Sequence, residues 1–300
     1  MSEIVLPPHQ YNLHIPVLLD ATLRLLDPQK GESYLDLTAG YGGHAQAFLE
    51  RTGEYEHTVF VDRDDYALAQ LEGFSKKGVR MIHADFVSAA QQLVEEGKTY
   101  ALILLDLGVS SPQLDQSERG FSFTHNGPLD MRMDRRQELT AAELVNTARA
   151  DELTRIIREY GEESFVTSKR IAQAIVKGRP LNTTGELAEL ILQAFNGRRG
   201  KIHPATRTFQ ALRIAVNQEL RQVEEVLPLL PKLLKSGGRV GVISFHSLED
   251  RLVKRYFAEQ KAAGFEAELQ ILTKKPLDGV TYDVHNPRSR SAKLRVAVKI

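Results

Sequence analysis

The stretch "SYLDLTAGYGGHAQAFLER", from Ser33 to Arg51, joins a short apolar segment, a glycine-rich turn and a segment with helical spacing. The apolar start predicts a buried strand, and the alanines, phenylalanine and leucine of "HAQAFLER" predict a helix. Glycines between a strand and a helix allow a tight turn and a close approach of the backbone to a ligand. A strand followed by a helix in this way predicts a βαβ unit of a parallel sheet.

The same alternation continues along the chain and returns near its end. Strands are predicted at residues 33–37, 57–62, 79–84, 101–107, 239–245, 267–274 and 291–299. The segment "VNQELRQVEEVLPLLPKLLKSGG" (216–238) predicts an amphipathic helix that Pro228 and Pro231 break or kink. We therefore expect an α/β fold with a mostly parallel sheet whose last strand is antiparallel.

The middle of the chain differs, because three segments there have helical spacing and no strand is evident. These segments are "AAELVNTARADELTRIIREYG", "SFVTSKRIAQAIVKG" and "TGELAELILQAFNG". We therefore expect an all-helical insert domain at 114–206, and a sheet domain formed by 1–113 and 207–300.

Composition narrows the function classes. The 300 residues carry no net formal charge and no cysteine, which excludes disulfides and thiolate metal sites. No apolar run reaches membrane-spanning length, and the start of the chain lacks the features of a signal peptide, so we expect a cytoplasmic protein without a membrane partner. A nucleic-acid partner would have to bind a local basic surface.

The glycine turn carries the first functional indication. Gly40-x-Gly42-x-x-Ala45 matches the dinucleotide fingerprint, with Asp62 about twenty residues further on. However, Asp36 would face the pyrophosphate, and two like charges about 4 Å apart repel by roughly 4 kcal/mol at an effective dielectric near 20. The carboxylate suits the ammonium and sulfonium groups of S-adenosylmethionine, whose ribose hydroxyls would find an acceptor in Asp62. A tight turn without a ligand is the alternative.

The third strand also ends in an acid. Asp85 could accept a hydrogen bond from an adenine amino group, with Phe86 packed on the ring, although Asp85 also suits a helix N-cap. Ligands of open α/β sheets bind at the carboxyl edge, where these acids would meet.

The fourth strand leads into an unusual loop, "ALILLDLGVSSPQLDQSERGFSFTHNGPLDMRMD", from Ala101 to Asp134. The buried strand ends in Asp106, and structureless loops of this length are usually functional. Phe121 and Phe123 could stack an extruded base or pack in the core. Three arginines of this region could bind phosphate or carboxylate groups: Arg119, Arg132 and Arg135.

Two runs near the proposed site are basic and free of acids. They contain Arg198, Arg199, Lys201, Arg207 and Arg213 in residues 193–218, and Arg288, Arg290, Lys293 and Arg295 in the tail. Such runs are usually solvated surface, but their position favours contact with an RNA backbone.

The segment "FHSLEDR" (245–251) follows the fifth strand. His246 would lie at the active edge as a candidate substrate-binding residue, and Ser247-x-x-Asp250 fits a helix cap. A His-x-x-Glu pair without a further ligand is a poor metal site, so we predict no metal.

Several segments together closely resemble the bacterial ribosomal RNA small subunit methyltransferase H family, also called MraW. They are "HIPVLLDATLRLL", "DLTAGYGGHAQAFLE", "LLDLGVSSPQLDQSERGFSFTHNGPLDMRMD", "HPATRTFQALRIAVNQEL", "GGRVGVISFHSLEDRLVKRYF" and "NPRSRSAKLRVA". The resemblance implies a Rossmann-like enzyme that uses S-adenosylmethionine to methylate the exocyclic N4 of a cytosine in the decoding region of 16S rRNA. Its partner would be 16S rRNA or the small subunit, and a homodimer is compatible with the sequence.

The resemblance also assigns site residues. It implies donor contacts at Gly42, Gly43, His44, Asp62, Phe86, Asp106 and Gln113. His44 could instead only bond the turn. The amine that is methylated needs a hydrogen-bond acceptor beside the donor, and Asp106, Ser111 and a backbone carbonyl near Pro112 remain alternatives. "SSPQ" lacks the aromatic residue of the related Asp/Asn/Ser-Pro-Pro-aromatic loop, and a loop that only packs is also open.

The chain departs from the family in the segment between Phe257 and Asn286, which is shorter, while Ala39 and Tyr41 occupy positions that vary. Two other functions remain open at this stage: a nicotinamide-dependent oxidoreductase, and a non-catalytic RNA-binding assembly factor.

Overall fold

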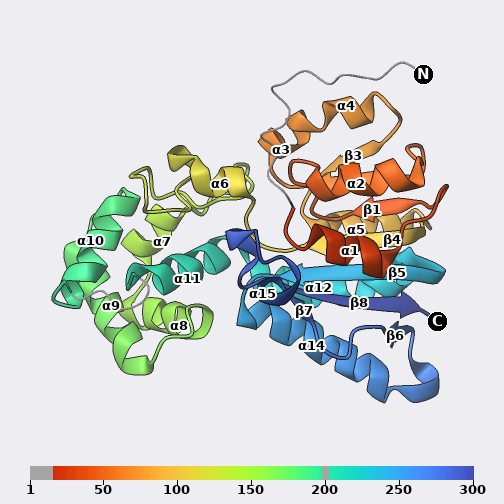
Figure 1. Cartoon of the computed structure of the whole chain (residues 1–300). Helices are drawn as coiled ribbons and strands as arrows, with labels where there is room; N and C mark the ends of the chain where they lie inside the picture. The colour runs from red at the N-terminus through yellow and green to blue at the C-terminus, as the bar shows by residue number, and fades with distance from the viewer. Residues whose placement is uncertain (1–15, 198–202) are drawn as a thin grey trace. The chain divides into compact units, whose positions relative to one another are not determined.

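The computed structural model describes residues 16–197 and 203–300, which divide into two compact units (Figure 1). The first unit contains the described residues up to Gly108 and from Val223 onward, and the second contains Val109–Gln222. The second unit includes more residues at both ends than the insert predicted at 114–206. The reason is that α11 (Ala205–Asn217) buries its apolar side chains, Leu212 among them, in the core of the second unit.

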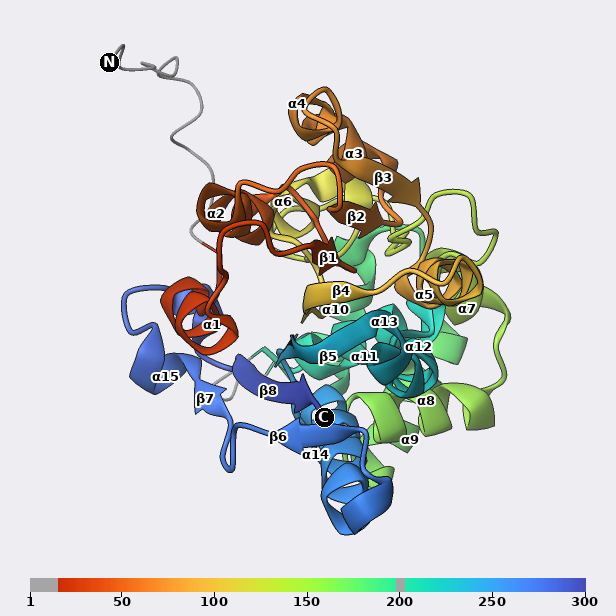
Figure 2. The same cartoon turned by 90° about the vertical axis from the view of Figure 1, so that its right-hand side faces the viewer.

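The first unit is built on one mixed sheet (Figure 2). The strands from β1 to β4 cover Tyr34–Asp36, Val59–Asp62, Arg80–His83 and Tyr100–Asp106, and those from β5 to β8 cover Leu234–Ser244, Leu269–Ile271, Leu277–Asp278 and Lys293–Lys299. The order is β3-β2-β1-β4-β5-β8-β6, and β7 pairs with β8. Neighbouring strands in the part of the sheet ordered β3-β2-β1-β4-β5 are parallel. Strand β8 is antiparallel to β5, β6 and β7. The predicted α/β sheet with an antiparallel last strand is confirmed.

The helix predicted at 216–238 is divided and ends earlier. It becomes α12 (Glu219–Val226), the 3₁₀ turn η3 (Leu227–Leu229) and α13 (Leu230–Leu233). Pro228 and Pro231 lie in the first turns of the two later pieces, where the missing N–H of proline costs no hydrogen bond. The prediction was wrong for residues 234–238, which begin β5. The two-residue β7 was not predicted, because a segment that short has no periodicity.

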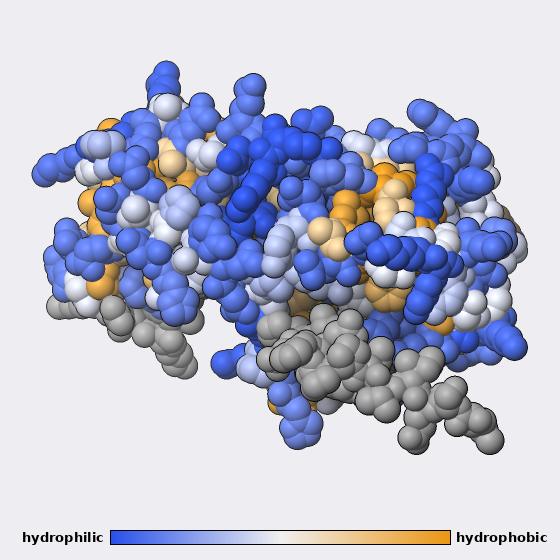
Figure 3. Space-filling view, turned by 90° about the horizontal axis from the view of Figure 1, so that it is seen from above, coloured by the Kyte–Doolittle hydropathy of each residue, from blue (hydrophilic) through white to orange (hydrophobic). Residues whose placement is uncertain are grey.

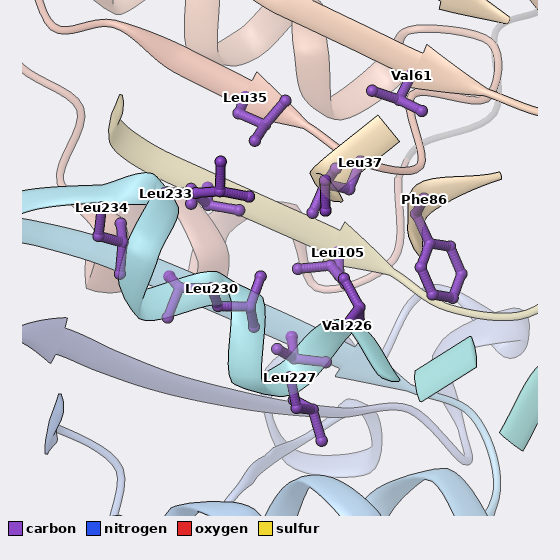
Figure 4. Close-up of a cluster of buried hydrophobic side chains, with 14 of the residues drawn as sticks. Leu35, Leu37, Val61, Phe86, Leu105, Val226, Leu227, Leu230, Leu233 and Leu234 are labelled. Atoms are coloured by element: carbon purple, nitrogen blue, oxygen red, sulfur yellow. The ribbon is translucent and has the colours of Figure 1, made fainter. Parts of the chain in front are cut away.

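Helices cover both faces of the sheet. One core cluster contains Leu93 of α5, Leu230 of α13 and Val253 of α14, packed on the strands, and Figure 4 shows part of it. A second cluster joins Leu26 of α1 and Phe48 of α2 to the other face. Parallel strands covered on both faces explain the near-continuous apolar runs of the sequence. Besides η3 and α13, the helices of this unit are α1 (Leu19–Leu26), α2 (Gly43–Thr52), α3 (Asp65–Gln70), α4 (Glu72–Ser75), α5 (Phe86–Glu95), α14 (Ser247–Ala262) and α15 (Gly279–Tyr282), with the 3₁₀ turns η4 (Gly264–Glu266) and η5 (Pro287–Ser289).

The second unit is helical, as predicted. Its elements are α6 (Ser111–Asp115), η2 (Ser117–Arg119), α7 (Ala141–Thr147), α8 (Ala150–Tyr160), α9 (Phe165–Gly178), α10 (Thr184–Ala194) and α11. The β-pairing described in this unit is a single bridge between Pro128 and Thr183. Asn217 fixes the long loop to α11, because its Nδ2 donates to the Met131 carbonyl at 2.7 Å and its Oδ1 accepts from the Met133 N–H at 2.8 Å.

One face of the molecule is mostly polar. Figure 3 shows a face that is largely hydrophilic with smaller hydrophobic areas. Among the described residues, no helix is long and apolar enough to cross a membrane. Three of the large apolar side chains that are exposed belong to one helix, α9: Phe165, Val166 and Val176.

Candidate active site

The glycine turn between β1 and α2 requires glycine for two physical reasons. Gly40 and Gly42 have φ values of 52° and 81°, which L side chains rarely adopt. A Cβ at Gly42 would also lie 2.7 Å from Leu71 Cδ2, and one at Gly43 would lie 2.6 Å from Pro16 Cγ. The space beside Gly42 and Gly43 is therefore filled by the protein's own side chains.

Asp36, at the end of β1, supports this turn from inside the core. Its side chain accepts hydrogen bonds from the Tyr34 hydroxyl at 2.6 Å and the Thr38 N–H at 3.1 Å, and the residue is 1% exposed. Burial raises the pKa of Asp36 to about 6. The sequence predicted that Asp36 meets the cationic group of a ligand, but its burial and its internal partners instead assign it to holding the turn.

Asp62, at the end of β2, connects the turn to the next strand. Its Oδ2 accepts from the Gly40 N–H and its Oδ1 from the Asp64 N–H, both at 2.8 Å. An ionised carboxylate has about four acceptor positions, so two remain for ligand hydroxyls. Burial raises the pKa of Asp62. This geometry fits the predicted acceptor of two ribose hydroxyls.

Asp85 and Phe86 have local structural roles. Asp85 is the N-cap of α5 and accepts from the Val87 and Ser88 N–H groups and the Ser88 hydroxyl, at 3.0, 2.9 and 2.7 Å. The alternative explanation of Asp85 as a helix cap thus accounts for both of its oxygens. Phe86 is 8% exposed and packs in the core cluster of Figure 4 beside Leu105.

Asp106 and His44 form an unusual buried pair. His44 Nε2 lies 3.6 Å from Asp106 Oδ2, and the backbone at Val17 also interacts with the imidazole. Among the described residues, Asp106 Oδ1 has no hydrogen-bond partner. Burial lowers the pKa of His44 to about 4, so the imidazole is neutral at pH 7. Burial, followed by repulsion from Asp36 and Glu249, raises the pKa of Asp106 well above its ordinary value. The Asp106 side chain remains 26% exposed, which leaves it open to a ligand.

Thr38 joins the two strand ends and was missed by the sequence analysis. Its Oγ1 accepts from the Asp106 N–H at 2.6 Å, while its own N–H donates to Asp36 Oδ1. The role of Tyr34 was also missed. A threonine after a strand and a tyrosine within one are common in any α/β protein, so neither residue type pointed to these contacts.

The carboxyl edge of β1, β2 and β4 brings together three acidic side chains, and burial raises the pKa of each. Asp36, Asp62 and Asp106 form no ion pair with a lysine or arginine among the residues that the structure describes. Buried carboxylates without cations favour a ligand that brings positive charge. A sulfonium and an ammonium group, as in S-adenosylmethionine, fit this edge, whereas a pyrophosphate does not.

In the second unit, the start of α6 explains part of the "SSPQ" segment. Ser110 and Gln113 form a capping box, in which the Gln113 Oε1 accepts from the Ser110 N–H at 3.0 Å. Ser111 is the first helical residue, and the Pro112 carbonyl accepts from the Gln116 N–H at 2.9 Å. The Pro112 carbonyl is therefore already engaged in the helix, which weakens it as the catalytic acceptor.

Three residues predicted to bind substrate are structural instead. Arg119 is 3% exposed and donates to the Arg132 and Met133 carbonyls at 3.1 and 3.2 Å. Arg132 forms a two-point ion pair with Asp130 at 2.8 and 2.9 Å. Phe121 is 7% exposed in the core of the unit. For Phe121 the structure thus favours the core alternative, and the two arginines have internal partners that only the fold of the loop brings together.

Phe123 remains a candidate for base stacking. It is half-buried, with its ring centroid 4.8 Å from those of Phe209 and His203. Arg207 is exposed, 3.6 Å from Glu163. Arg198, Arg199 and Lys201 lie outside the described residues.

The predicted cap of α14 is displaced by one residue. The N-cap is His246, which forms a capping box with Glu249, so the prediction of a Ser247–Asp250 cap was wrong. Asp250 instead binds Lys293 and Arg295 at 3.1 and 2.8 Å. These two tail cations therefore stabilise the sheet, and only the remaining tail cations can contribute to a basic surface.

Comparison with known proteins gives consistent results. The model of the MraW methylase family matches residues 11–300. The chain is 49% identical over 294 residues to the ribosomal RNA small subunit methyltransferase H of a Cyanothece species, covering 96% of this chain and 95% of the relative. The proteins of the same name from a Synechocystis species and Heliobacterium modesticaldum are 48% and 46% identical, covering 96% of this chain and 93% and 98% of the relatives.

Proposed function

The chain belongs to the MraW methylase family, and from this premise we propose that it transfers a methyl group from S-adenosylmethionine to the exocyclic N4 of a cytosine in the decoding region of 16S rRNA. The observation that carries the proposal is the identity of 49% over nearly the full length of a small-subunit rRNA methyltransferase. The carboxyl edge of the first unit supports it, because its acids form no ion pair with a lysine or arginine among the described residues and so suit a cationic donor. We expect the protein to act in the cytoplasm on 16S rRNA or the small subunit.

Donor binding falls to residues of the first unit. Asp62 would accept from the two ribose hydroxyls, and the turn at Gly40, which Asp62 and Asp36 fix, would let the backbone approach the donor. S-adenosylmethionine supplies an electrophilic methyl group on a sulfonium. Asp106 would lie near that charge, since it ends the strand beside β1.

Asp106 is the proton acceptor in this proposal. The lone pair of cytosine N4 is delocalised into the ring, so the amine attacks well only when a hydrogen-bond acceptor draws on its protons. A carboxylate with a raised pKa is a stronger base than an ordinary one. His44, which is neutral and 3.6 Å away, would orient the carboxylate by donating from Nε2. Ser111 is the remaining alternative acceptor.

The other two functions are less well supported. A nicotinamide-dependent oxidoreductase would need a site for a pyrophosphate, which the acids of β1 and β4 would repel. A non-catalytic RNA-binding factor would have no need for a carboxyl group such as that of Asp106, whose Oδ1 has no hydrogen-bond partner among the described residues.

Two measurements test the proposal. Calorimetric titration should give heat of binding with S-adenosylmethionine and none with NAD. Labelled donor should then transfer its methyl group to small subunits that lack the modification. Binding of NAD alone would favour the oxidoreductase, and donor binding without transfer to RNA or subunits would favour the non-catalytic factor.

A further inference from the structure

Helix α9 has a solvent face that differs in charge from those of its neighbours. The exposed residues of α9 are Phe165, Val166, Lys169, Arg170, Gln173, Val176 and Lys177. At 100° per residue, these positions form one continuous face, and the buried residues lie on the opposite side. We call these seven residues the α9 face. It carries three cations, three apolar side chains and no acid.

The cations of the α9 face are not neutralised locally. Among the described residues, Lys169, Arg170 and Lys177 form no ion pair with a carboxylate. By contrast, the exposed side of α8 mixes signs, and Arg155 pairs there with Glu159 at 3.1 Å. An ordinary solvated helix surface shows such mixed charges. Lysine and arginine side chains without partners on one face favour a polyanionic partner.

Acids on the neighbouring helix are engaged by their own helix. Glu186 of α10 accepts from the Asn182 and Thr183 N–H groups at 2.8 and 3.0 Å, and Glu189 accepts from Gln193 at 3.0 Å. These bonds orient the two carboxylates toward α10, and neither forms an ion pair with α9. The cations of the α9 face therefore have no carboxylate partner on α10.

The α9 face contacts Phe195, which lies in the acid-free run of residues 193–218. The guanidinium carbon of Arg170 lies 5.7 Å from the ring centroid of Phe195, at the start of that run. The chain from Ser164 to Gly185 is likewise free of acids. Lys169 and Lys177 are separated by about 12 Å along the helix axis, at 1.5 Å per residue, which allows contact with more than one phosphate.

We propose that the α9 face binds the phosphate backbone of the ribosomal RNA substrate, with Lys169, Arg170 and Lys177 as the contacting cations. This inference rests on the proposed function and names a part of the second unit that would bind the RNA. The absence of acids favours RNA over a protein partner, because protein interfaces select for aromatic and apolar cores more than for unbalanced cations.

The test uses the full-length protein and unmodified 16S rRNA without ribosomal proteins. The variant Lys169→Gln/Arg170→Gln/Lys177→Gln removes the three charges and keeps residues that favour a helix. A matched control, Lys254→Gln/Arg255→Gln/Lys261→Gln, removes two lysines and one arginine from α14. Its face has mixed charge, since Arg255 contacts Glu224 and Glu259 at 3.2 and 3.8 Å.

We expect the α9 variant to bind the rRNA roughly ten- to a hundred-fold more weakly at about 0.1 M salt, with a salt slope reduced by about 2 to 3. Its affinity for S-adenosylmethionine should not change, and Lys169→Arg/Lys177→Arg should bind like the wild type. Three results would overturn the inference. The first is an unchanged RNA affinity and salt slope in the α9 variant, and the second is an equal loss of RNA affinity in the α14 control. The third is a loss of affinity for assembled subunits but not for free rRNA, which would indicate a protein partner. Wild-type protein that binds RNA through α9 but transfers no methyl group would contradict the proposed function alone.

Discussion

At the scale of single residues, the acids of the site differ in what they can do. Asp36 is enclosed by Tyr34 and Thr38, Asp62 is half-engaged by backbone N–H groups, and Asp106 has one oxygen without a partner among the described residues. The extent to which the protein's own groups occupy the carboxyl oxygens therefore decreases from Asp36, which supports the turn, to Asp106, which would contact the reacting amine. This order is the reason that Asp106, rather than Asp36, is proposed as the catalytic carboxylate.

Asp62→Asn is expected to weaken the binding of S-adenosylmethionine while the protein remains folded. The amide keeps one acceptor oxygen for the turn but cannot accept from both ribose hydroxyls. Hydrogen bonds to charged groups contribute about 1.5–3 kcal/mol, which corresponds to a loss of roughly ten- to a hundred-fold in affinity by calorimetry. Unchanged donor affinity in the folded variant would show that Asp62 serves only the turn.

Asp36→Asn is expected to change how stability depends on pH. The folded pKa of Asp36 is raised from 3.8 to about 6, so the folded state binds the proton more tightly than the unfolded state. The wild type therefore loses stability as pH rises from about 4 to 6, by roughly 3 kcal/mol at 1.36 kcal/mol per pKa unit. His44, with its lowered pKa, contributes the opposite slope in an overlapping range. Only the difference between wild type and variant therefore isolates Asp36.

The measurement is thermal unfolding of both proteins between pH 4 and 8. The variant should gain stability relative to the wild type as pH rises to about 6, and the difference should be constant above that pH. A difference that is the same at every pH would mean that Asp36 does not titrate in this range.

At the scale of elements, helix α2 shows how the glycine turn is built. Gly42 and Gly53 are its N-cap and C-cap, and both are left-handed, with φ of 81° and 61°. They differ in surroundings, because a Cβ at Gly42 would meet Leu71, whereas one at Gly53 would meet open space.

Alanine substitutions at Gly42 and Gly53 should separate the cost of left-handed backbone strain from the cost of steric overlap with Leu71. Gly53→Ala is expected to cost about 1–2 kcal/mol, the penalty of a left-handed alanine. Gly42→Ala adds overpacking against Leu71, for a total of about 2–5 kcal/mol. Urea unfolding measures both, and donor affinity should fall for Gly42→Ala alone. Equal costs would mean that Leu71 moves aside freely.

The elements also show what the sequence could predict. Apolar runs and glycine turns identified the strands of the parallel sheet and the helical character of the second unit, because those features depend on local spacing. The short β7 and the early start of β5 depend on pairing with distant strands. Likewise, Arg119 was misassigned, because its carbonyl partners at Arg132 and Met133 become neighbours only when the loop folds.

At the scale of the whole molecule, each unit has its own core. The second unit buries Leu153, Ile171 and Leu212 in a cluster that contains only residues of that unit. The first unit buries two clusters, one on each face of its sheet. Separate cores are the property that lets parts of a chain fold independently.

A fragment of residues 109–222 is therefore expected to fold alone. It should show a helical circular dichroism spectrum and cooperative urea unfolding with a slope of about 1–3 kcal/mol/M. Leu212→Ala in this fragment should cost about 2–5 kcal/mol, because the side chain is fully buried. A fragment without a cooperative transition would show that this unit needs the rest of the chain.

Nucleoside mass spectrometry of 16S rRNA shows which atom the protein methylates and whether Asp106 takes part in the reaction. Small subunits that lack the modification are incubated with saturating S-adenosylmethionine and wild-type protein, Asp106→Asn, or the exposed control Asp20→Asn. We expect N4-methylcytidine with the wild type and the control. The rate should fall by roughly 10²–10³ with Asp106→Asn, the cost of losing one preorganised interaction at the reacting centre. A methyl group on another atom, or a folded Asp106→Asn with the wild-type rate, would contradict the account.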